Sequence, residues 1–497
     1  MRTWASRGDR SGRTSCSGPA ADRSTPARGC GSLPWTERLT RRSLLTAGAG
    51  FLAGLTGGYA LGRWGPGLPD WPGRPSPSSG PTAPTALPLG VEIVDIDPIT
   101  GLDLARQIGV TWVRLLLGWQ DLEPQPGVFQ WEAADRLLTA ALERELRPLV
   151  VLTGVPPWAG PEPGGPLDEA GQEAFARLLA AAARRYGPRG VKHWELFNEP
   201  DNGDFERRWL GGSWGRAPEA YAALLRRVYP ALKAADPTAH LVMGGLALDW
   251  FTDDDLHPHR PGPFVRDFLD RVLAAGGGAF FDIANFHYYP NFRPRWEPHG
   301  RDIMGKAAFL RRTLAAYGVS KPVLCTEIGA WVDPDRGGSP DWQATYAVQA
   351  MVRGMAADLQ AVIWFNLVDL TMPGMARYGL VTREGIPRPA FRALQVLRQR
   401  LDQAVFVRPL TPGDLGTEGV EGYLFYAPLS GTQIQVIWAT APVADLPPFR
   451  PHLPNVQRTV RLPQPPARLL DRDGQPRPPA ASLTVGPQPL YLEYEGY

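Results

Sequence analysis

From Gly90 onward, the chain alternates short apolar runs with longer stretches in which apolar positions recur every three or four residues. The short runs predict β-strands and the longer stretches predict amphipathic helices, such as Glu132–Arg144 and Asp168–Tyr186. Eight strand and helix units follow one another. The predicted strands are Val91–Ile96, Trp112–Leu116, Leu149–Thr153, His193–Asn198, Leu241–Gly245, Asp282–His287, Val323–Glu327 and Val362–Asn366.

This alternation predicts an α/β fold with a parallel sheet and crossover helices. Eight units between residues 89 and 401 favour a closed (β/α)8 TIM barrel over an open, doubly wound sheet. The first strand is not followed by the Gly-x-Gly-x-x-Gly motif of dinucleotide-binding folds. We therefore expect a barrel that binds no dinucleotide.

The pattern changes after Leu401, where short alternating runs are separated by Pro and Gly. These runs predict a small β-sandwich over residues 402–497, packed on the barrel. Support of the barrel is the expected role of this domain, and carbohydrate binding is the alternative. The runs are Gly422–Tyr426, Ile434–Trp438, Val460–Leu462 and Leu490–Tyr494.

The N-terminal residues predict an exported protein. Arg41 and Arg42 precede the apolar, Gly-rich stretch Leu44–Leu61, as in a twin-arginine signal, so residues 1–62 read as a leader. The alternative is an uncleaved membrane anchor, although its many glycines make this stretch marginal for a span. Residues 63–88 are rich in Gly, Pro and Ser and predict a linker.

Composition narrows the possible partners and chemistry. The net charge is only +2, and no Lys/Arg stripe is interleaved with aromatic residues, so we expect no nucleic-acid binding. Of the three cysteines, Cys16 and Cys30 lie in the leader, and Cys325 lies in an apolar run that predicts a buried core residue. No disulfide is expected in the folded region.

Unusual polar residues cluster where the predicted strands end, which is the edge of a barrel that carries active sites. Glu199 closes the fourth strand and Glu327 closes the seventh, so the two carboxylates meet only if the sheet closes on itself. Such a pair points to hydrolysis of glycosidic bonds. The other polar residues on these strands are Arg114, Asn198, His287 and Tyr289.

Tryptophans near strand ends are candidates for stacking against sugar rings. Trp158, Trp331 and Trp364 are the preferred platforms, whereas Trp209 and Trp214 are as consistent with core packing.

No metal or other cofactor is expected. The one candidate for a metal site is His257-Pro-His259, with Asp253, Asp254 and Asp255 just upstream. These histidines lie in a Pro-rich loop and not at the end of the first strand, where metal-dependent barrel hydrolases place a His-x-His pair.

Five motifs, in order and on the expected strands, resemble the clan of retaining glycoside hydrolases whose catalytic glutamates follow strands four and seven of a (β/α)8 barrel. The resemblance covers Val91 to Leu401. It is closest to the β-xylosidase and α-L-iduronidase family, family 39, with the cellulase and mannanase family, family 5, second. The motifs are Val113–Pro124 with Gly127–Trp131, Phe197–Pro200, His287–Tyr289, Thr326–Gly329 and Trp364.

The resemblance implies a double-displacement mechanism in which Glu199 is the acid/base and Glu327 is the nucleophile, with carboxyl groups about 5–5.5 Å apart. Arg114 and Tyr289 would then keep Glu327 ionised. Asn198 would donate to the sugar 2-OH, and His287 would order the network. The alternatives are an endo-β-glucanase or mannanase and a catalytically silent polysaccharide-binding protein. The sugar, the linkage and the oligomeric state are not predicted.

Overall fold

The computed structural model describes residues 87–204, 213–254, 261–372, 374–441 and 454–495, which fall in one compact unit, Ser78–Tyr497. The predicted leader and all but the end of the predicted linker lie outside the described residues. So do Trp209 and the pair His257 and His259.

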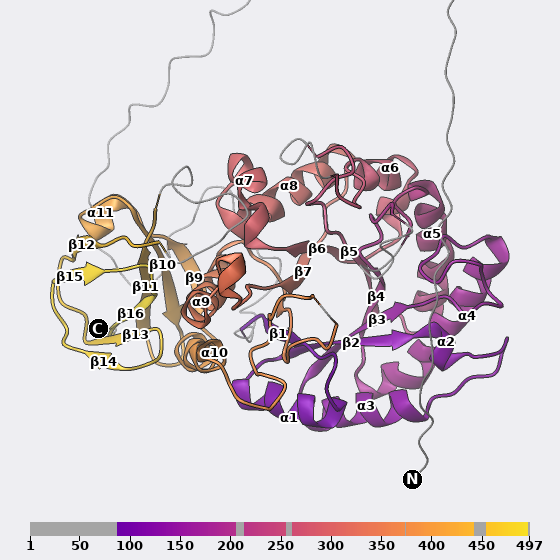
Figure 1. The fold of residues 1–497 in the computed structure, drawn as a ribbon, viewed down its shortest axis with the longest axis horizontal. Coiled ribbons are helices and arrows are strands. Elements are labelled where there is room, and N and C mark those ends of the chain that lie inside the picture. The colour runs from indigo at the N-terminus through magenta and orange to yellow at the C-terminus, as the bar shows by residue number, and fades with distance from the viewer. Residues whose placement is uncertain (1–86, 205–212, 255–260, 373, 442–453, 496–497) are drawn as a thin grey trace, which may run out of the picture. The chain divides into compact units, whose positions relative to one another are not determined.

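Eight parallel strands form the central sheet (Figure 1). Their order is β5-β4-β3-β2-β1-β8-β7-β6, and parallel bridges between Val242 and Ile283 and between Leu246 and Phe286 join the two outer strands. The sheet is therefore a closed barrel, as predicted. The strands are β1 Leu89–Glu92, β2 Trp112–Gly118, β3 Arg147–Thr153, β4 His193–Asn198, β5 His240–Gly245, β6 Ala284–Tyr288, β7 Val323–Ile328 and β8 Val362–Trp364.

Helices surround this sheet, and the two helices named from periodicity agree with the structure to within one residue. The side chain of Asp168 accepts a hydrogen bond from the Gly171 amide, and this cap sets the start of α4. In the described part of the chain, no helix has the length and apolar character to cross a membrane. The helices are α1 Pro98–Ile108, α2 Trp119–Leu122, α3 Glu132–Glu143, α4 Glu169–Tyr186, α5 Pro218–Ala235, α6 Phe268–Ala274, α7 Arg293–Trp296, α8 Asp302–Ala316, α9 Pro340–Ala356 and α10 Pro389–Leu401.

The first strand is shorter than the apolar run Val91–Ile96 predicts. It starts at Leu89 and ends at Glu92, because Asp95 adopts a left-handed backbone with φ 56° and Asp97 then caps α1. The polar residues that follow the strand therefore turn the chain earlier than its apolar residues indicate.

An apolar layer fills the barrel interior near the N-terminal ends of the strands. Its members form a cluster separate from the main core and come only from strands or from the residue just before a strand, which places them inside the barrel. They are Trp112, Leu149, Val242, Ile283, Leu324, Ala361 and Ile363. This layer is the floor on which the polar residues farther along each strand rest.

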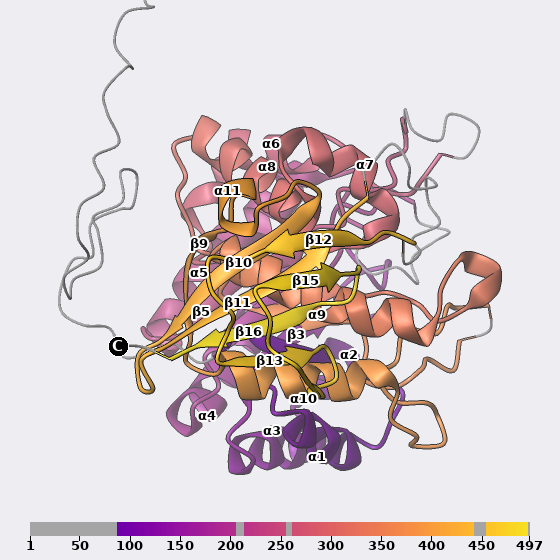
Figure 2. The same ribbon diagram turned by 90° about the vertical axis from the view of Figure 1, so that its left-hand side faces the viewer.

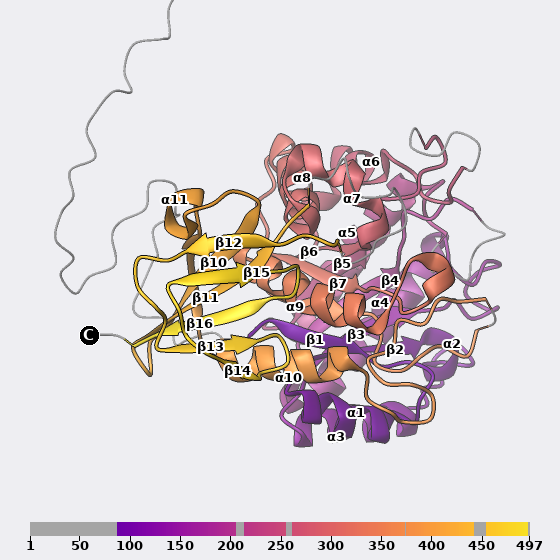
Figure 3. The same cartoon turned by 60° about the vertical axis from the view of Figure 1, so that its left-hand side comes forward.

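A second, antiparallel sheet follows the barrel, as predicted (Figures 2 and 3). Six strands have the order β14-β13-β16-β11-β10-β9, and β12 pairs with β15 in a separate two-stranded sheet. The elements are β9 Val405–Pro409, α11 Pro412–Leu415, β10 Val420–Ala427, β11 Thr432–Ala439, β12 Arg458–Arg461, β13 Arg468–Asp471, β14 Pro476–Arg477, β15 Ser482–Val485 and β16 Leu490–Tyr494.

The two faces of this sheet belong to different cores. Val436 and Trp438 join the main core of the barrel, whereas Ile437 and Ala439, which alternate with them along β11, join a smaller cluster with residues of β12 and β15. A buried ion pair of 2.8 Å between Arg353 on α9 and Glu421 on β10 adds to this contact. The barrel and the second sheet are therefore packed through a continuous apolar layer.

Candidate active site

A polar layer lies directly above the apolar floor of the barrel. Side chains alternate along a strand, so the residue two positions beyond each floor residue also faces the interior. At several strands that residue is polar and buried. Examples are Arg114, Asn285 and Thr326, two positions after Trp112, Ile283 and Leu324.

Arg114 is the hub of this layer and is fully buried. Its Nε and Nη2 atoms donate to the two carboxylate oxygens of Glu195 at 3.1 and 2.9 Å, and Nη2 also donates to Asn198 Oδ1 at 2.6 Å. Its Nη1 atom donates to Glu92 and to Glu327, both at 2.7 Å. Burial disfavours the cation, but the surrounding carboxylates outweigh it and raise the Arg114 pKa well above its ordinary value. Arg114 therefore carries the positive charge that holds three glutamates.

Glu327 lies at the end of β7 with both carboxylate oxygens engaged. Oε1 accepts from Arg114, and Oε2 accepts from the Tyr289 hydroxyl at 2.9 Å. Burial raises the pKa of Glu327, whereas Arg114 and the Tyr289 hydroxyl act in the opposite direction. These two donors make Glu327 the better stabilised anion of the pair.

Glu199 lies at the end of β4 in a different environment. Burial raises its pKa well above the ordinary value, and the nearby charge of Glu327 raises it further. Its Oε1 atom lies 3.0 Å from His287 Nδ1. Glu199 is therefore the carboxyl group of the pair that holds a proton more strongly.

Hydrogen bonds around Thr326 indicate which ring nitrogen of His287 carries the proton. The Thr326 hydroxyl donates to Glu195 and accepts from Asn285 at 2.8 Å, so its remaining lone pair accepts from His287 Nε2 at 3.2 Å. Burial lowers the His287 pKa well below its ordinary value, so the ring is neutral. Nδ1 is then an acceptor for the proton of Glu199.

The backbone of β4 leaves regular strand geometry at Phe197, just before the functional residues Asn198 and Glu199. The alternation of side chains along a strand does not predict this change. Phe197 and Glu199 have left-handed backbones, with φ values of 60° and 44°. Phe197 stacks on Phe175 of α4, and both Asn198 and Glu199 make contacts inside the barrel. Strained residues of this kind are common in active sites.

A similar irregularity occurs in β7. The pairing of β7 with β6 shifts register between Phe286 and His287, and its pairing with β8 shifts between Cys325 and Ile328. As a result, the consecutive residues Thr326 and Glu327 both contact interior groups. Such bulges re-aim side chains next to active sites. Cys325 itself is fully buried in the core, as predicted.

The two glutamates and His287 converge. The facing side-chain atoms of Glu199, His287 and Glu327 all lie within 4.8 Å of one another. Three such groups could hold a metal ion, but Arg114, Tyr289 and His287 already supply a donor or acceptor to each carboxyl group. We assign no metal, because this hydrogen bonding suits a pair of catalytic carboxyl groups without one.

The aromatic residue that contacts the site at the end of β8 is Phe365, which directly follows the strand. Trp364 is fully buried in the core, and its indole N–H donates to the Tyr378 carbonyl at 3.2 Å. Phe365 lies two positions after the floor residue Ile363, and its ring contacts those of Tyr289 and Tyr378 at 6.2 and 5.4 Å. A fully buried indole offers no face to a sugar, so Trp364 does not fit the stacking role predicted for it, and Phe365 is the better candidate.

The remaining tryptophans differ in their surroundings. Trp331 packs edge-on against Tyr378 with the ring centres 5.8 Å apart, and half-buried Trp158 donates to the Glu123 carbonyl at 3.1 Å. Stacking of these two rings on a substrate stays a prediction. Trp214 is fully buried between Phe197 and Tyr221.

The structure therefore links six of the predicted residues by hydrogen bonds or short contacts: Arg114, Asn198, Glu199, His287, Tyr289 and Glu327. Sequence reasoning missed Glu92, Glu195, Thr326 and Phe365. Glu92 and Glu195 carried a detectable signal, because each is a charged residue inside an apolar strand run.

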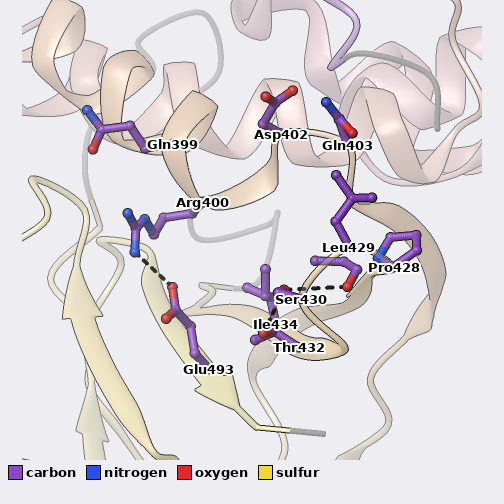
Figure 4. Close-up of a pocket in the computed structure, with 11 residues that line it drawn as sticks. Gln399, Arg400, Asp402, Gln403, Pro428, Leu429, Ser430, Thr432, Ile434 and Glu493 are labelled. Atoms are coloured by element: carbon purple, nitrogen blue, oxygen red, sulfur yellow. Dashed lines mark hydrogen bonds and ion pairs between the residues drawn. The ribbon is translucent and has the colours of Figure 1, made fainter.

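A hollow of about 300 Å³ lies away from these residues, between the end of α10 and the turn that joins β10 to β11 (Figure 4). Arg400 and Glu493 line it and form an ion pair of 3.2 Å. The described residues that line it include no aromatic ring, so it lacks a stacking surface for a sugar.

Comparisons with known proteins agree with this geometry. The family model described as cellulase, glycosyl hydrolase family 5, matches residues 97–367, more than half of the chain. A curated β-xylosidase from Caldicellulosiruptor saccharolyticus is 24% identical over an alignment of 249 positions, and the match covers 45% of this chain and 46% of that protein. The chain thus spans about half the length of the curated relative that it matches.

Solved structures show the same fold. A family 39 glycoside hydrolase from Bacteroides cellulosilyticus WH2 has a TM-score of 0.63 at 22% identity and covers 83% of this chain and 81% of its own. A GH39 enzyme from Xanthomonas axonopodis pv. citri has a TM-score of 0.56 at 17% identity, with 84% and 96% covered. A GH39 β-xylosidase from Caulobacter crescentus has a TM-score of 0.55 at 16% identity, with 83% and 97% covered. Both families that the motifs resemble are thus represented.

Proposed function

This chain belongs to the cellulase family, glycosyl hydrolase family 5, and from that membership we propose that it hydrolyses O-glycosidic bonds of an oligo- or polysaccharide by double displacement. The separation of the glutamates carries the proposal. Their facing atoms lie within 4.8 Å of each other, which suits direct attack by one carboxylate, whereas inverting enzymes keep carboxyl groups about 6.5–9.5 Å apart to admit a water.

In the first step, the Glu327 carboxylate attacks the anomeric carbon of the sugar. The bond from that carbon to the leaving oxygen breaks, and Glu199 gives its proton to this oxygen. The carboxylate becomes a neutral glycosyl ester. Arg114 and Tyr289 orient Glu327 for the attack, and the His287 ring keeps the proton of Glu199 in place before transfer.

In the second step, Glu199 is a carboxylate and takes a proton from a water molecule. The water oxygen bonds to the anomeric carbon, the ester bond breaks, and Glu327 leaves as a carboxylate. Because Asn198 accepts from Arg114 through Oδ1, its amide nitrogen is the donor end, which suits a contact with the sugar 2-OH.

Replacement of Glu199 by alanine tests the acid/base role. Without the acid, we expect hydrolysis of glycosides with poor leaving groups to fall by about 10²- to 10⁴-fold. Aryl glycosides with activated leaving groups should still form the glycosyl-enzyme, and added azide should restore turnover by attacking it directly. Rates would be measured on both substrate classes with and without azide. Equal loss on both classes and no azide rescue would contradict the role.

The pKa of Glu199 also sets the expected pH dependence of the unaltered chain. The raised pKa keeps the acid protonated to higher pH than an ordinary glutamate, so the contribution of acid catalysis to activity on poor leaving groups should be lost as pH rises through that raised value. A pH profile of kcat/KM measures this.

Phe365 is the proposed stacking surface for the sugar beside the nucleophile. Phe365→Ala should raise KM and lower kcat/KM by about 10- to 100-fold, as expected from losing a stacking contact of about 1–3 kcal/mol. Phe365→Tyr should keep most of the activity, since it preserves the ring. Steady-state kinetics on one aryl glycoside measures both variants, and Phe365→Ala kinetics equal to those of the unaltered chain would disprove the assignment.

The sugar is to be found by assaying the full chain on a panel of aryl β-glycosides and polysaccharides, with Glu327→Gln as the control. A β-xyloside is the first substrate to try, since the curated relative is a β-xylosidase, and β-glucans and mannans test the endo-acting alternative. Turnover that disappears in the control supports the proposed function. Polysaccharide binding without turnover of any substrate would instead favour a catalytically silent binding protein.

We further propose export through a twin-arginine signal, based on Arg41 and Arg42 ahead of an apolar stretch. An uncleaved segment that anchors the protein to a membrane is the second choice. The barrel would span residues 89–401 and the β-rich domain residues 402–497, with residues 63–88 as the linker. Replacement of both arginines by lysine should block export of the chain from a bacterial host, as measured by fractionation.

A further inference from the structure

Glu92 is the last residue of β1 and lies beside Arg114. It takes no part in the two chemical steps proposed above. It is 3% exposed, and β1 pairs with β2 so that Glu92 and Arg114 are register partners. Its Oε2 atom lies 2.7 Å from Arg114 Nη1, and the same nitrogen lies 2.7 Å from Glu327 Oε1. Glu92 and the proposed nucleophile therefore share a single nitrogen.

The hydrogen bonds of Arg114 leave no spare donor. A guanidinium has five N–H groups in a rigid plane. Nε donates one to Glu195, Nη2 donates to Glu195 and Asn198, and Nη1 donates to Glu92 and Glu327. Glu195 therefore fixes one edge of the guanidinium plane. At the other end, one N–H of Nη1 points to Glu92 and the other points to Glu327. A movement of Nη1 toward Glu92 would lengthen its hydrogen bond to Glu327.

The charges around Glu92 make this sharing sensitive to its protonation. The charged groups that face it are Arg114 on β2, Glu195 on β4 and Glu327 on β7. Burial and the charges of the two glutamates, against the lowering effect of Arg114, together raise the pKa of Glu92 to about 8. At neutral pH, Glu92 is therefore a neutral acceptor beside an ionised Glu327.

We propose that Glu92 is a positioning residue that acts on the nucleophile through Arg114, because it holds one N–H of Nη1 and thereby directs the other to Glu327. This inference rests on the proposed function, since it needs Glu327 to be the nucleophile. When Glu92 ionises, it draws Nη1 toward itself, and Glu327 loses its orientation. When Glu327 becomes a glycosyl ester, Glu92 keeps Arg114 in place for the second step.

The test uses a background in which Glu199 cannot contribute to the pH dependence. In Glu199→Ala, with an activated aryl glycoside and azide, neither step needs a proton from residue 199. Raising the pH from about 7 to about 9.5 should then lower the rate about tenfold, the effect of one pKa unit of interaction. Adding Glu92→Gln, which is neutral at every pH and keeps the acceptor oxygen, should abolish this fall.

Asp369→Asn is the matched control, because Asp369 is another buried carboxylate paired with an arginine, Arg388. This variant should keep the fall in rate. A fall that persists in Glu92→Gln, or no fall in its parent, overturns the inference. If the unaltered chain turns over no glycoside, the proposed function is contradicted and the inference falls with it. If the chain is active but Glu92→Gln leaves the pH dependence of Glu199→Ala unchanged, only the inference is overturned.

A single variant gives a second test in case the double variant does not fold. Glu92→Asp keeps the carboxyl group but is one methylene shorter, so its oxygen does not reach Nη1. We expect kcat to fall about tenfold, with KM for the activated glycoside unchanged because Glu92 does not touch the substrate. Glu92→Gln should restore kcat at pH 7. An unchanged kcat in Glu92→Asp, or a loss that appears only in KM, would overturn the positioning role.

Discussion

Replacement of Glu327 by glutamine should lower kcat on the order of 10⁵-fold, the largest effect on activity expected of any variant of this protein. Glutamine preserves the shape of the side chain and can still accept from Arg114 through its single amide oxygen, but its amide nitrogen cannot accept from Tyr289 and the amide cannot attack the anomeric carbon. Both steps of hydrolysis pass through the ester on Glu327, so azide should not rescue this variant. That result would separate Glu327 from Glu199.

Steady-state rates on an activated aryl glycoside measure the loss, and mass spectrometry of the protein after rapid acid quenching looks for the covalent glycosyl adduct. The adduct should be absent in Glu327→Gln and present in Glu199→Ala. Glu173→Gln, on the partly exposed face of α4, is the control and should behave like the unaltered chain. A Glu327→Gln variant with more than a few per cent of normal activity would remove Glu327 as the nucleophile.

The largest loss of stability should follow the replacement of Arg114 by methionine. Methionine fills much of the same space but leaves Glu92, Glu195 and Glu327 without their shared cation. Breaking a buried ion pair by removing one partner costs about 3–5 kcal/mol of unfolding free energy. The cost should be smaller at low pH, because protonation of the stranded carboxyl groups removes their charge in the folded state and stability is then lost as pH rises.

Urea unfolding at about pH 5 and at about pH 8 measures this loss and its pH dependence. The control is Arg185→Met, because Arg185 pairs with Asp135 at the surface, where both side chains are partly exposed. Exposed pairs contribute about 0–1 kcal/mol, so this variant should unfold almost like the unaltered chain. Equal losses in the two variants would mean that Arg114 does not balance a buried charge cluster.

The repeating pattern of the sequence predicts the barrel well because each strand and helix has its own local signal. Every one of the eight predicted strands occurs, although β1 ends at Glu92 and β8 ends at Trp364. Strand ends are harder to predict because they depend on the backbone. The left-handed conformation of Asp95, for example, has no apolar signature.

The site is partly predictable for a related reason. Motifs place Glu199 and Glu327 on strands four and seven, and closure of the barrel brings them together. Alternation then fails at Phe197 and in β7, where left-handed residues and a register shift turn consecutive side chains to the same side. Sequence reasoning missed Phe365 because the family motif names its neighbour, Trp364. Phe365 faces inward because it lies two positions after the floor residue Ile363.

The apolar layer shared by the barrel and the second sheet bears on how this protein could be rearranged by evolution or by engineering. Trp438 and Val436 are core residues of the barrel as much as of the sheet, and Arg353 and Glu421 neutralise each other at the junction. A detached barrel would expose this apolar surface to water, and a sheet grafted onto another barrel would need matching partners on α9 and α10. Exchange of the second sheet for an unrelated one should therefore cost the barrel part of its own core.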